Sequence, residues 1–214
     1  MCGIGLVAGN NAKLRKESVL IIEKHQKNRG PDFSKIQSFK NLSICHQRLS
    51  IVGLDKKFNQ PYFYKKFILL FNGEIYNFRE IAKSYNLSKN SHISDTACLA
   101  ELISKIGFEK SIKIIDGMYS ICLLDKNSQS INICVDDFNI KQLYYAKVLD
   151  NIVVASTVNP LIEIIKKYDN QITIDKTTKI WNSSSSNLIP LKAIIFKEFN
   201  DAIFLCNFIN IGKG

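Results

Sequence analysis

The sequence predicts an α+β protein in which two multistranded sheets are packed between helices. Strand-length apolar segments occur in groups, with four candidates between residues 117 and 156, and helical segments separate the groups. This order favours two sheets with outer helices over alternating βαβ units. The chain has 214 residues, of which 46% are hydrophobic, which is ample for one large core. We therefore expect a single domain over residues 1–214.

The elements expected within residues 1–71 are mostly strands. Residues 13–27 are the exception, because Leu, Val and Ile alternate there with Lys and Glu in the pattern of an amphipathic helix. Lys40-Asn41 suits the turn of a hairpin. The dipeptide Asn72-Gly73 is a strong turn signal and is expected to end the apolar strand before it. The strands expected here are 2–9, 33–39, 42–46 and 67–71.

The rest of the chain, from residue 77 onward, is expected to place helices before and after a second group of strands. Ser94-Asp95 offers an N-cap to one helix, and Asn159-Pro160 opens another. The expected helices are 77–85, 96–106, 108–113 and 160–168. The expected strands are 117–125, 130–136, 143–148, 151–156, 191–199 and 202–209.

The net charge of +10 permits a nucleic acid, an anionic membrane or an acidic protein as a partner. The lysines are scattered, however, and no basic run is interleaved with aromatic residues, which favours a solvated Lys-rich surface. No apolar run approaches the ~20 residues of a membrane span. No basic region precedes the first apolar stretch, as it would in a signal peptide. We expect a cytoplasmic protein that binds neither nucleic acid nor membrane.

The six cysteines show no CxxC pair and no Cys/His ligand spacing, so we expect no metal site. All but the first lie in apolar runs and are expected to be small, reduced core residues. These five are Cys45, Cys98, Cys122, Cys134 and Cys206.

Cys2 is different, because it becomes the first residue once the initiator Met1 is removed. A thiol and a free α-amine then lie on one residue, and an amine with a pKa of about 7.7–8 can take the thiol proton directly or through one water. Such a pair is an N-terminal nucleophile that needs no His base. Gly3 and Gly5 would leave room for a substrate. Residues 2–9 can also be interpreted as an ordinary buried strand, so this segment alone leaves both interpretations open.

Several further motifs follow in order over residues 1 to about 165. Together they resemble the glutaminase domain of class II glutamine amidotransferases, and most of all the N-terminal domain of glutamine-dependent asparagine synthetases. Each motif alone is weak, and their order makes the resemblance specific. The motifs are Met1-Cys2-Gly3-Ile4, Arg29-Gly30-Pro31-Asp32, His46-Gln47-Arg48-Leu49-Ser50-Ile51-Val52, Phe71-Asn72-Gly73-Glu74-Ile75-Tyr76-Asn77, Ser94-Asp95-Thr96, Asp116-Gly117-Met118-Tyr119 and Leu143-Tyr144-Tyr145.

The resemblance implies a four-layer αββα sandwich of the N-terminal-nucleophile hydrolase type. It also implies a reaction without cofactor or metal. The thiolate of Cys2 would attack the side-chain amide of L-glutamine, and a γ-glutamyl thioester would form as ammonia leaves. Water would then release glutamate.

The resemblance gives catalytic roles to Asn72 and Gly73. Acyl transfer builds negative charge on the amide oxygen, and each fixed donor aimed at that oxygen lowers the barrier by roughly 3–4 kcal/mol. The side-chain amide of Asn72 and the backbone N–H of Gly73 match the family positions of these donors. The alternative is that the dipeptide is an ordinary hairpin turn.

Glutamine also carries two charged groups at its α-carbon. The carboxylate calls for a fork-shaped cation, and Arg48 matches the family position for it. The ammonium calls for acceptors, and Glu74 and Asp95 match those positions. Asp95 is also compatible with a simple helix cap.

Other residues near these motifs have weaker assignments. Arg29 and Asp32 are expected to hold a loop near Cys2, and His46 is expected to be structural. The family's substrate-lining segment corresponds to four consecutive residues, of which the last two also suit a core position. These four are Leu49, Ser50, Ile51 and Val52.

The sequence departs from asparagine synthetases in two respects. Those proteins continue into a domain that binds ATP and aspartate, whereas these 214 residues contain no Ser-Gly-Gly-x-Asp-Ser loop and no other Gly-rich phosphate motif. Asn139 and Gln142 stand where the family has Gly and Pro, and Ala155-Ser156-Thr157 replaces its Ala-Ser-Glu. We therefore hypothesise a glutaminase, free-standing or part of a longer protein, that supplies ammonia to a separate acceptor.

Two other interpretations remain open. The chain could be a non-catalytic or regulatory subunit that kept the fold and binds glutamine, although a dead copy need not keep Cys2 and the other site residues. It could also be an N-terminal-nucleophile amidase that acts on a different amide. Substrate choice separates this last interpretation from the first.

Overall fold

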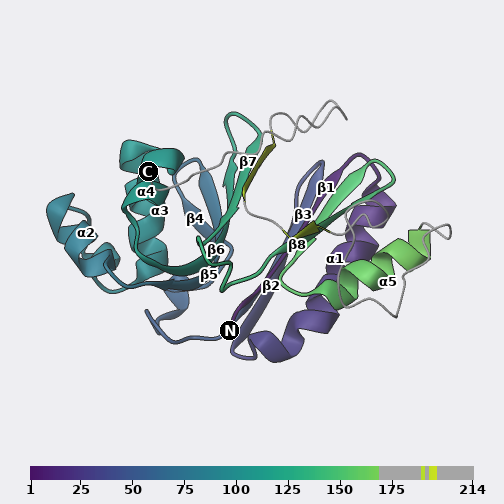
Figure 1. The fold of residues 1–214 in the computed structure, drawn as a ribbon, viewed down its shortest axis with the longest axis horizontal. Helices are drawn as coiled ribbons and strands as arrows, with labels where there is room; N and C mark the ends of the chain where they lie inside the picture. The colour runs from purple at the N-terminus through teal and green to yellow at the C-terminus, as the bar shows by residue number, and fades with distance from the viewer. Residues whose placement is uncertain (169–188, 191–192, 197–214) are drawn as a thin grey trace.

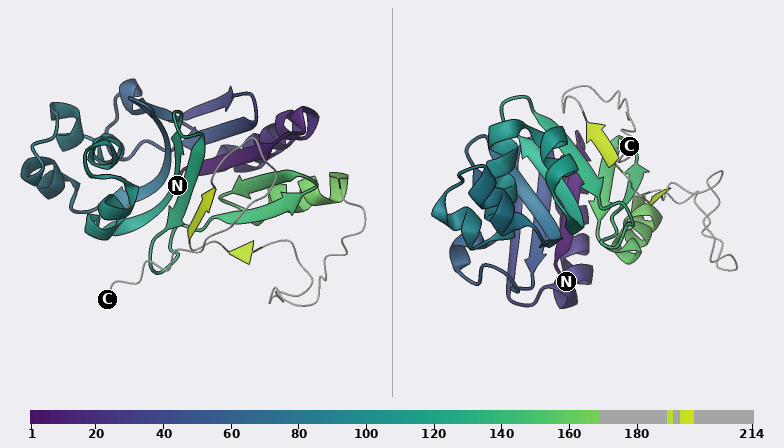
Figure 2. Two further views of the ribbon diagram at one scale, coloured as in Figure 1. Left: turned by 90° about the horizontal axis from the view of Figure 1, so that it is seen from above. Right: turned by 60° about the vertical axis from the view of Figure 1, so that its left-hand side comes forward.

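Two antiparallel sheets lie face to face between two layers of helices (Figure 1). This architecture is seen in a computed structural model that describes residues 1–168, 189–190 and 193–196. Viewed from above, helices α1 and α5 lie on one side of the paired sheets and α2, α3 and α4 on the other (Figure 2). The expected αββα sandwich is confirmed.

The first sheet has the strand order β10-β8-β9-β1-β3-β2, with β1 at its centre. It is covered by α1 (Ala12–Gln26) and α5 (Val158–Tyr168). The short 3-10 turn η1 (Lys27–Arg29) follows α1. The strands are β1 (Gly3–Gly9), β2 (Phe33–Ser38), β3 (Leu42–Arg48), β8 (Tyr144–Val148), β9 (Asn151–Ala155) and β10 (Ile189–Pro190).

The second sheet has the order β11-β7-β6-β5-β4, so β4 forms one edge. Its strands are β4 (Tyr62–Tyr64), β5 (Phe67–Ile75), β6 (Gly117–Asp125), β7 (Ser130–Val135) and β11 (Ala193–Phe196). Its outer face is covered by α2 (Phe78–Ser84), α3 (Asp95–Ile106) and α4 (Phe108–Ile114). Two 3-10 turns, η2 (Lys56–Phe58) and η3 (Lys89–His92), lie in the connections.

The alternation of β1 explains why its sequence is apolar throughout. Ile4 and Leu6 point into the core between the sheets, while Val7 points to the layer of α1 and α5. A Cβ on Gly5 would lie 2.5 Å from Cγ2 of Ile22 in α1 and closer still to the thiol of Cys45. Helix α1 therefore packs directly on the backbone of β1, which fixes the strand that follows Cys2.

One expectation about β5 is wrong. The strand does not end at Asn72-Gly73 but continues to Ile75, in register with β6. The long β6 partner overrides the local turn preference of the dipeptide, because the added length of ladder contributes further backbone hydrogen bonds at alternate residue pairs. The other expected elements occur within a few residues of their predicted bounds, and the expected strand at 202–209 lies outside the described residues.

The expectation for the cysteines is confirmed where the structure describes them. Cys45, Cys98, Cys122 and Cys134 are buried and unbridged, whereas Cys206 lies outside the described residues. No helix among the described residues combines the length and the apolar character needed to span a bilayer.

The core between the sheets predicts a measurable cost of truncation. Leu70 is fully buried there, so Leu70→Ala should lower the free energy of unfolding by about 2–5 kcal/mol. Urea denaturation measures this. Leu20→Ala on α1, where the side chain is half exposed, serves as the control and should change stability by less than about 0.5 kcal/mol. An equal effect of both variants would contradict the assigned core.

Candidate active site

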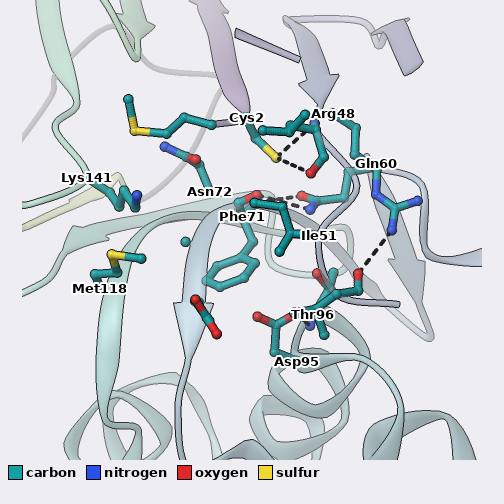
Figure 3. Close-up of a pocket in the computed structure, with 15 residues that line it drawn as sticks. Cys2, Arg48, Ile51, Gln60, Phe71, Asn72, Asp95, Thr96, Met118 and Lys141 are labelled. Carbon is teal, nitrogen blue, oxygen red and sulfur yellow. Dashed lines mark hydrogen bonds between the residues drawn. The ribbon is translucent and has the colours of Figure 1, made fainter. Parts of the chain in front are cut away.

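A pocket opens where the start of β1 meets the C-terminal half of β5 and the N-terminus of α3 (Figure 3). The space within it, with the open mouth included, is about 570 Å³. Cys2 and Asn72 lie at one end and Asp95 and Thr96 at the other. The lining residues are Met1, Cys2, Arg48, Leu49, Ile51, Val52, Gln60, Phe71, Asn72, Gly73, Glu74, Asp95, Thr96, Met118 and Lys141.

The thiol of Cys2 is held by the backbone that follows β3. Its Sγ lies 3.4 Å from the N–H of Leu49, which donates to it, and 3.6 Å from the carbonyl oxygen of Leu49. Burial raises the pKa of the thiol, and the hydrogen bond from Leu49 partly offsets this rise. Arg29 Nε donates to the carbonyl of Cys2 at 3.0 Å, so both ends of the residue are fixed.

Asn72 presents a donor to the same pocket. Its side chain is 1% exposed, and its Nδ2 has no hydrogen-bond partner among the described residues. An unpaired buried amide N–H costs about 1–3 kcal/mol. Because Asn72 also lines the pocket, this N–H can bond an acceptor on a ligand there.

The backbone of Gly73 faces the pocket as well. In an antiparallel strand, the N–H and C=O of one residue point to the same side, and those of the next residue to the other. The N–H of Phe71 donates to Gln60 and that of Ile75 to Asp95, both on the side of β5 away from β6. Gly73, midway between them, must therefore direct its N–H and C=O to that open side.

The register with β6 supports this orientation independently. Gly73 lies opposite Tyr119, whose own N–H and C=O are bonded to Asp136 on the far side of β6. Gly73 and Tyr119 therefore form a non-hydrogen-bonded pair, the closer of the two pair types. A Cβ on Gly73 would lie 2.2 Å from the carbonyl oxygen of Met118, so only glycine fits at this position.

Asp95 closes the other end of the pocket. It is the first residue of α3, but Ser94 is the N-cap and accepts from the N–H of Ala97. The Asp95 carboxylate accepts from Thr96 N at 2.7 Å and from Ile75 N at 3.4 Å. Burial outweighs these two hydrogen bonds and raises its pKa to about 6. The carboxylate is thus available to a cationic ligand group near neutral pH.

Arg48 lines the pocket, but its guanidinium is engaged with the segment that follows it. Nη1 donates to Asn59 Oδ1 at 2.6 Å and to the carbonyl of Asp55 at 3.3 Å. Nη2 donates to the carbonyls of Val52 and Gly53. Arg48 therefore holds residues 49–60, the Arg48 loop, over one side of the site.

Of the remaining residues predicted from the sequence, four line the pocket and one does not. Leu49, Ile51, Val52 and Glu74 line the pocket, although Ile51 is 70% exposed and lies at its mouth. Ser50 is not among the lining residues. Its N–H donates to Asp32 Oδ2 at 2.7 Å, an arrangement in which Asp32 holds the loop near Cys2 as expected.

His46 is fully buried beneath the site. Its Nε2 donates to the carbonyl of Phe71 at 3.2 Å, and burial lowers its pKa to about 4. The ring is therefore neutral at neutral pH and supports β5, in agreement with a structural role.

Six lining residues were not among the predicted site residues: Met1, Gln60, Phe71, Thr96, Met118 and Lys141. Met118 and Thr96 belong to two of the motifs that carry the family resemblance, so the sequence could have indicated them as site residues. Gln60 and Lys141 lie in loops with no distinctive pattern. Among the described residues, no three His, Cys, Asp or Glu side chains gather as metal ligands would.

Known proteins resemble this chain over most of its length. A family model described as "Glutamine amidotransferase domain" matches residues 1–199. Asparagine synthetase [glutamine-hydrolyzing] from Triphysaria versicolor is 34% identical over 156 residues, which cover 70% of this chain and 26% of that protein. Asparagine synthetase [glutamine-hydrolyzing] 2 from Oryza sativa subsp. japonica gives the same values. The chain thus spans about a quarter of the length of these relatives.

Solved structures agree on the fold. Glutamine phosphoribosylpyrophosphate amidotransferase from B. subtilis, complexed with ADP and GMP, has a TM-score of 0.62 at 17% identity, covering 76% of this chain and 43% of that one. A structure described as the allosteric regulatory enzyme of purine biosynthesis has a TM-score of 0.67 at 15% identity, covering 92% and 47%. The chain belongs to the class II glutamine amidotransferase family and is related to the glutaminase domains of asparagine synthetases.

Proposed function

We propose that this chain hydrolyses L-glutamine to glutamate and ammonia through a thioester on Cys2. The observation that carries the proposal is a pair of donors in the pocket of a cysteine thiol. Asn72 Nδ2 has no hydrogen-bond partner among the described residues, and the N–H of Gly73 points to the side of β5 away from β6. Two fixed donors beside a nucleophile are what a developing oxyanion requires.

The first half-reaction begins after removal of Met1, which leaves the α-amine on Cys2. This amine takes the thiol proton, and Sγ attacks the δ-carbon of the glutamine side chain. The carbonyl oxygen gains negative charge, which Asn72 Nδ2 and the Gly73 N–H stabilise. The carbon–nitrogen bond then breaks, and the proton held by the amine passes to the leaving nitrogen as ammonia. A γ-glutamyl thioester remains.

The second half-reaction hydrolyses the thioester and regenerates the free enzyme. A water molecule attacks the thioester carbon while the α-amine takes one of its protons, and the same two donors stabilise the second oxyanion. The carbon–sulfur bond breaks, the proton returns to sulfur, and glutamate leaves.

Charge complementarity supports glutamine as the substrate. The Asp95 carboxylate and the Gly73 C=O can accept from the α-ammonium. We propose that Arg48 binds the α-carboxylate by exchanging part of its contacts with the Arg48 loop. This recognition would favour an α-amino acid amide over other amides.

The ammonia acceptor is proposed from the relatives. Both asparagine synthetases extend far beyond the segment matched here, and their names describe glutamine hydrolysis coupled to a synthesis. We propose that the ammonia passes to a separate synthetase-type protein. Co-purification from the native cell tests this, and a monomer that releases all its ammonia to solvent without a partner would argue against it.

Cys2→Ala should abolish glutamate release, and protein that keeps Met1 should be similarly inactive because its amine is one residue away. Enzymatic glutamate detection, with the N-terminus verified by mass, measures both. An electrophilic glutamine analogue should label Cys2, which lines the pocket, and should not label Cys45, Cys98, Cys122 or Cys134, which are buried outside it. Labelling that persists in Cys2→Ala would contradict the proposed nucleophile.

Asn72→Ala should lower kcat by about 10²–10³-fold with little change in KM, because the lost donor acts on the oxyanion. Asn77→Ala is the control from the same motif. Its amide bridges the carbonyl of Ile114 and the N–H of Asp116 away from the pocket, so stability should fall more than kcat. Steady-state kinetics and thermal unfolding of both variants separate the two effects.

The raised pKa of Asp95 predicts a pH dependence. Only the ionised carboxylate pairs with the α-ammonium, so kcat/KM should rise as pH increases through about 6, the pKa in the free enzyme. Below that pH the carboxyl is protonated and binding weakens. Asp95→Asn should bind glutamine weakly and lose this limb of the profile. If kcat/KM of Asp95→Asn still rises through the same pH range as that of the wild type, the titration belongs to another group.

A further inference from the structure

Gln60 occupies a position where a strand would be expected. Strand β4 pairs with β5 only as far as Leu69, so the remainder of that edge has no neighbouring strand among the described residues. The Gln60 side chain is 3% exposed and binds the next part of this edge. Its Oε1 accepts from the N–H of Phe71 at 2.6 Å, and its Nε2 donates to the carbonyl of Phe71 at 3.0 Å.

These two hydrogen bonds are the pair that a residue on an adjacent antiparallel strand exchanges with its partner. The amide group of Gln60 thus replaces one peptide unit of a missing strand. At Ile75, two alternations further along, the carboxylate of Asp95 takes the backbone N–H in the same way. Gly73 lies between them on the same edge, and neither the Gln60 nor the Asp95 side chain accepts from its N–H.

We propose that Gln60 is a positioning residue for the oxyanion donors. By holding Phe71 as a neighbouring strand would, it fixes the orientation of Asn72 and of the Gly73 N–H toward Cys2, while leaving the Gly73 position open for the carbonyl oxygen of the substrate. The inference rests on the proposed glutaminase function and adds a residue to that site.

The placement of the contacts predicts which kinetic constant changes. Gln60 acts on the residue directly before Asn72, whereas the proposed ligand of the α-ammonium, Asp95, belongs to α3. Loss of the Gln60 amide would leave the N–H of Phe71 unpaired and let the edge of β5 shift. The donors would then fit the transition state poorly while ground-state binding remains.

Two variants test this. Gln60→Met keeps the volume without either hydrogen bond and should lower kcat by about ten- to a hundredfold with KM changed less than about threefold. Gln60→Glu keeps an acceptor for Phe71 N–H but loses the donor to Phe71 C=O. Its kcat relative to wild type should recover as pH falls, because a protonated carboxyl can donate again. Gln37→Met on β2 is the matched control and should behave as wild type.

A second readout does not need activity. Amide hydrogen exchange at Phe71, measured without substrate, should become faster in Gln60→Met and stay unchanged in Gln37→Met. Unchanged exchange, or a Gln60→Met variant with wild-type kcat or with a change in KM alone, would overturn the positioning role. An inactive wild type with accelerated exchange in Gln60→Met would instead overturn the proposed hydrolysis and leave the strand-like contact of Gln60 standing.

Discussion

The open edge of β5 is the constraint on which the site depends. An antiparallel strand alternates the sides to which its peptide groups point, and the β6 register assigns Asn72 and Glu74 to the ladder and Gly73 to the open side. A full-length β4 would have paired with Gly73 and removed its N–H from the pocket. Because β4 stops early, side chains bind the edge at Phe71 and Ile75 and the position between them stays open.

The layered packing brings the cysteine to this edge. Helix α1 lies directly on β1 at Gly5, and β3 pairs along the length of β1. Cys2, the residue before β1, therefore has a fixed position, and its thiol contacts both the N–H and the C=O of Leu49. Parts of the site that are distant in the sequence meet because the two sheets stack face to face over a shared apolar core. The position of the Cys2 thiol thus relies on contacts made by residues far from it along the chain.

Much of this was predictable from the sequence, for identifiable reasons. The layers follow from apolar periodicity, and the site residues from short motifs in a fixed order. The strand through Asn72-Gly73 was not predictable, because a local turn preference competes there with a long-range ladder that only the fold reveals. Gln60 was missed because its role lies in two hydrogen bonds to Phe71, a contact with no sequence pattern. The engagement of Arg48 with its own loop was missed for the same reason.

The contacts of Arg48 have a thermodynamic consequence. Its guanidinium serves Asn59 and three carbonyl groups of the Arg48 loop, so a carboxylate that approaches it competes with the loop for the same N–H groups. Closure of the loop and binding of an anion are then coupled equilibria, because both use the N–H groups of Arg48. Weakening the loop contacts strengthens the affinity for the anion, and a bound anion loosens the loop by the same free energy. Under the proposed binding of the glutamine carboxylate by Arg48, the loop sequence sets the substrate concentration at which the site fills, although most of the loop residues need not touch the substrate.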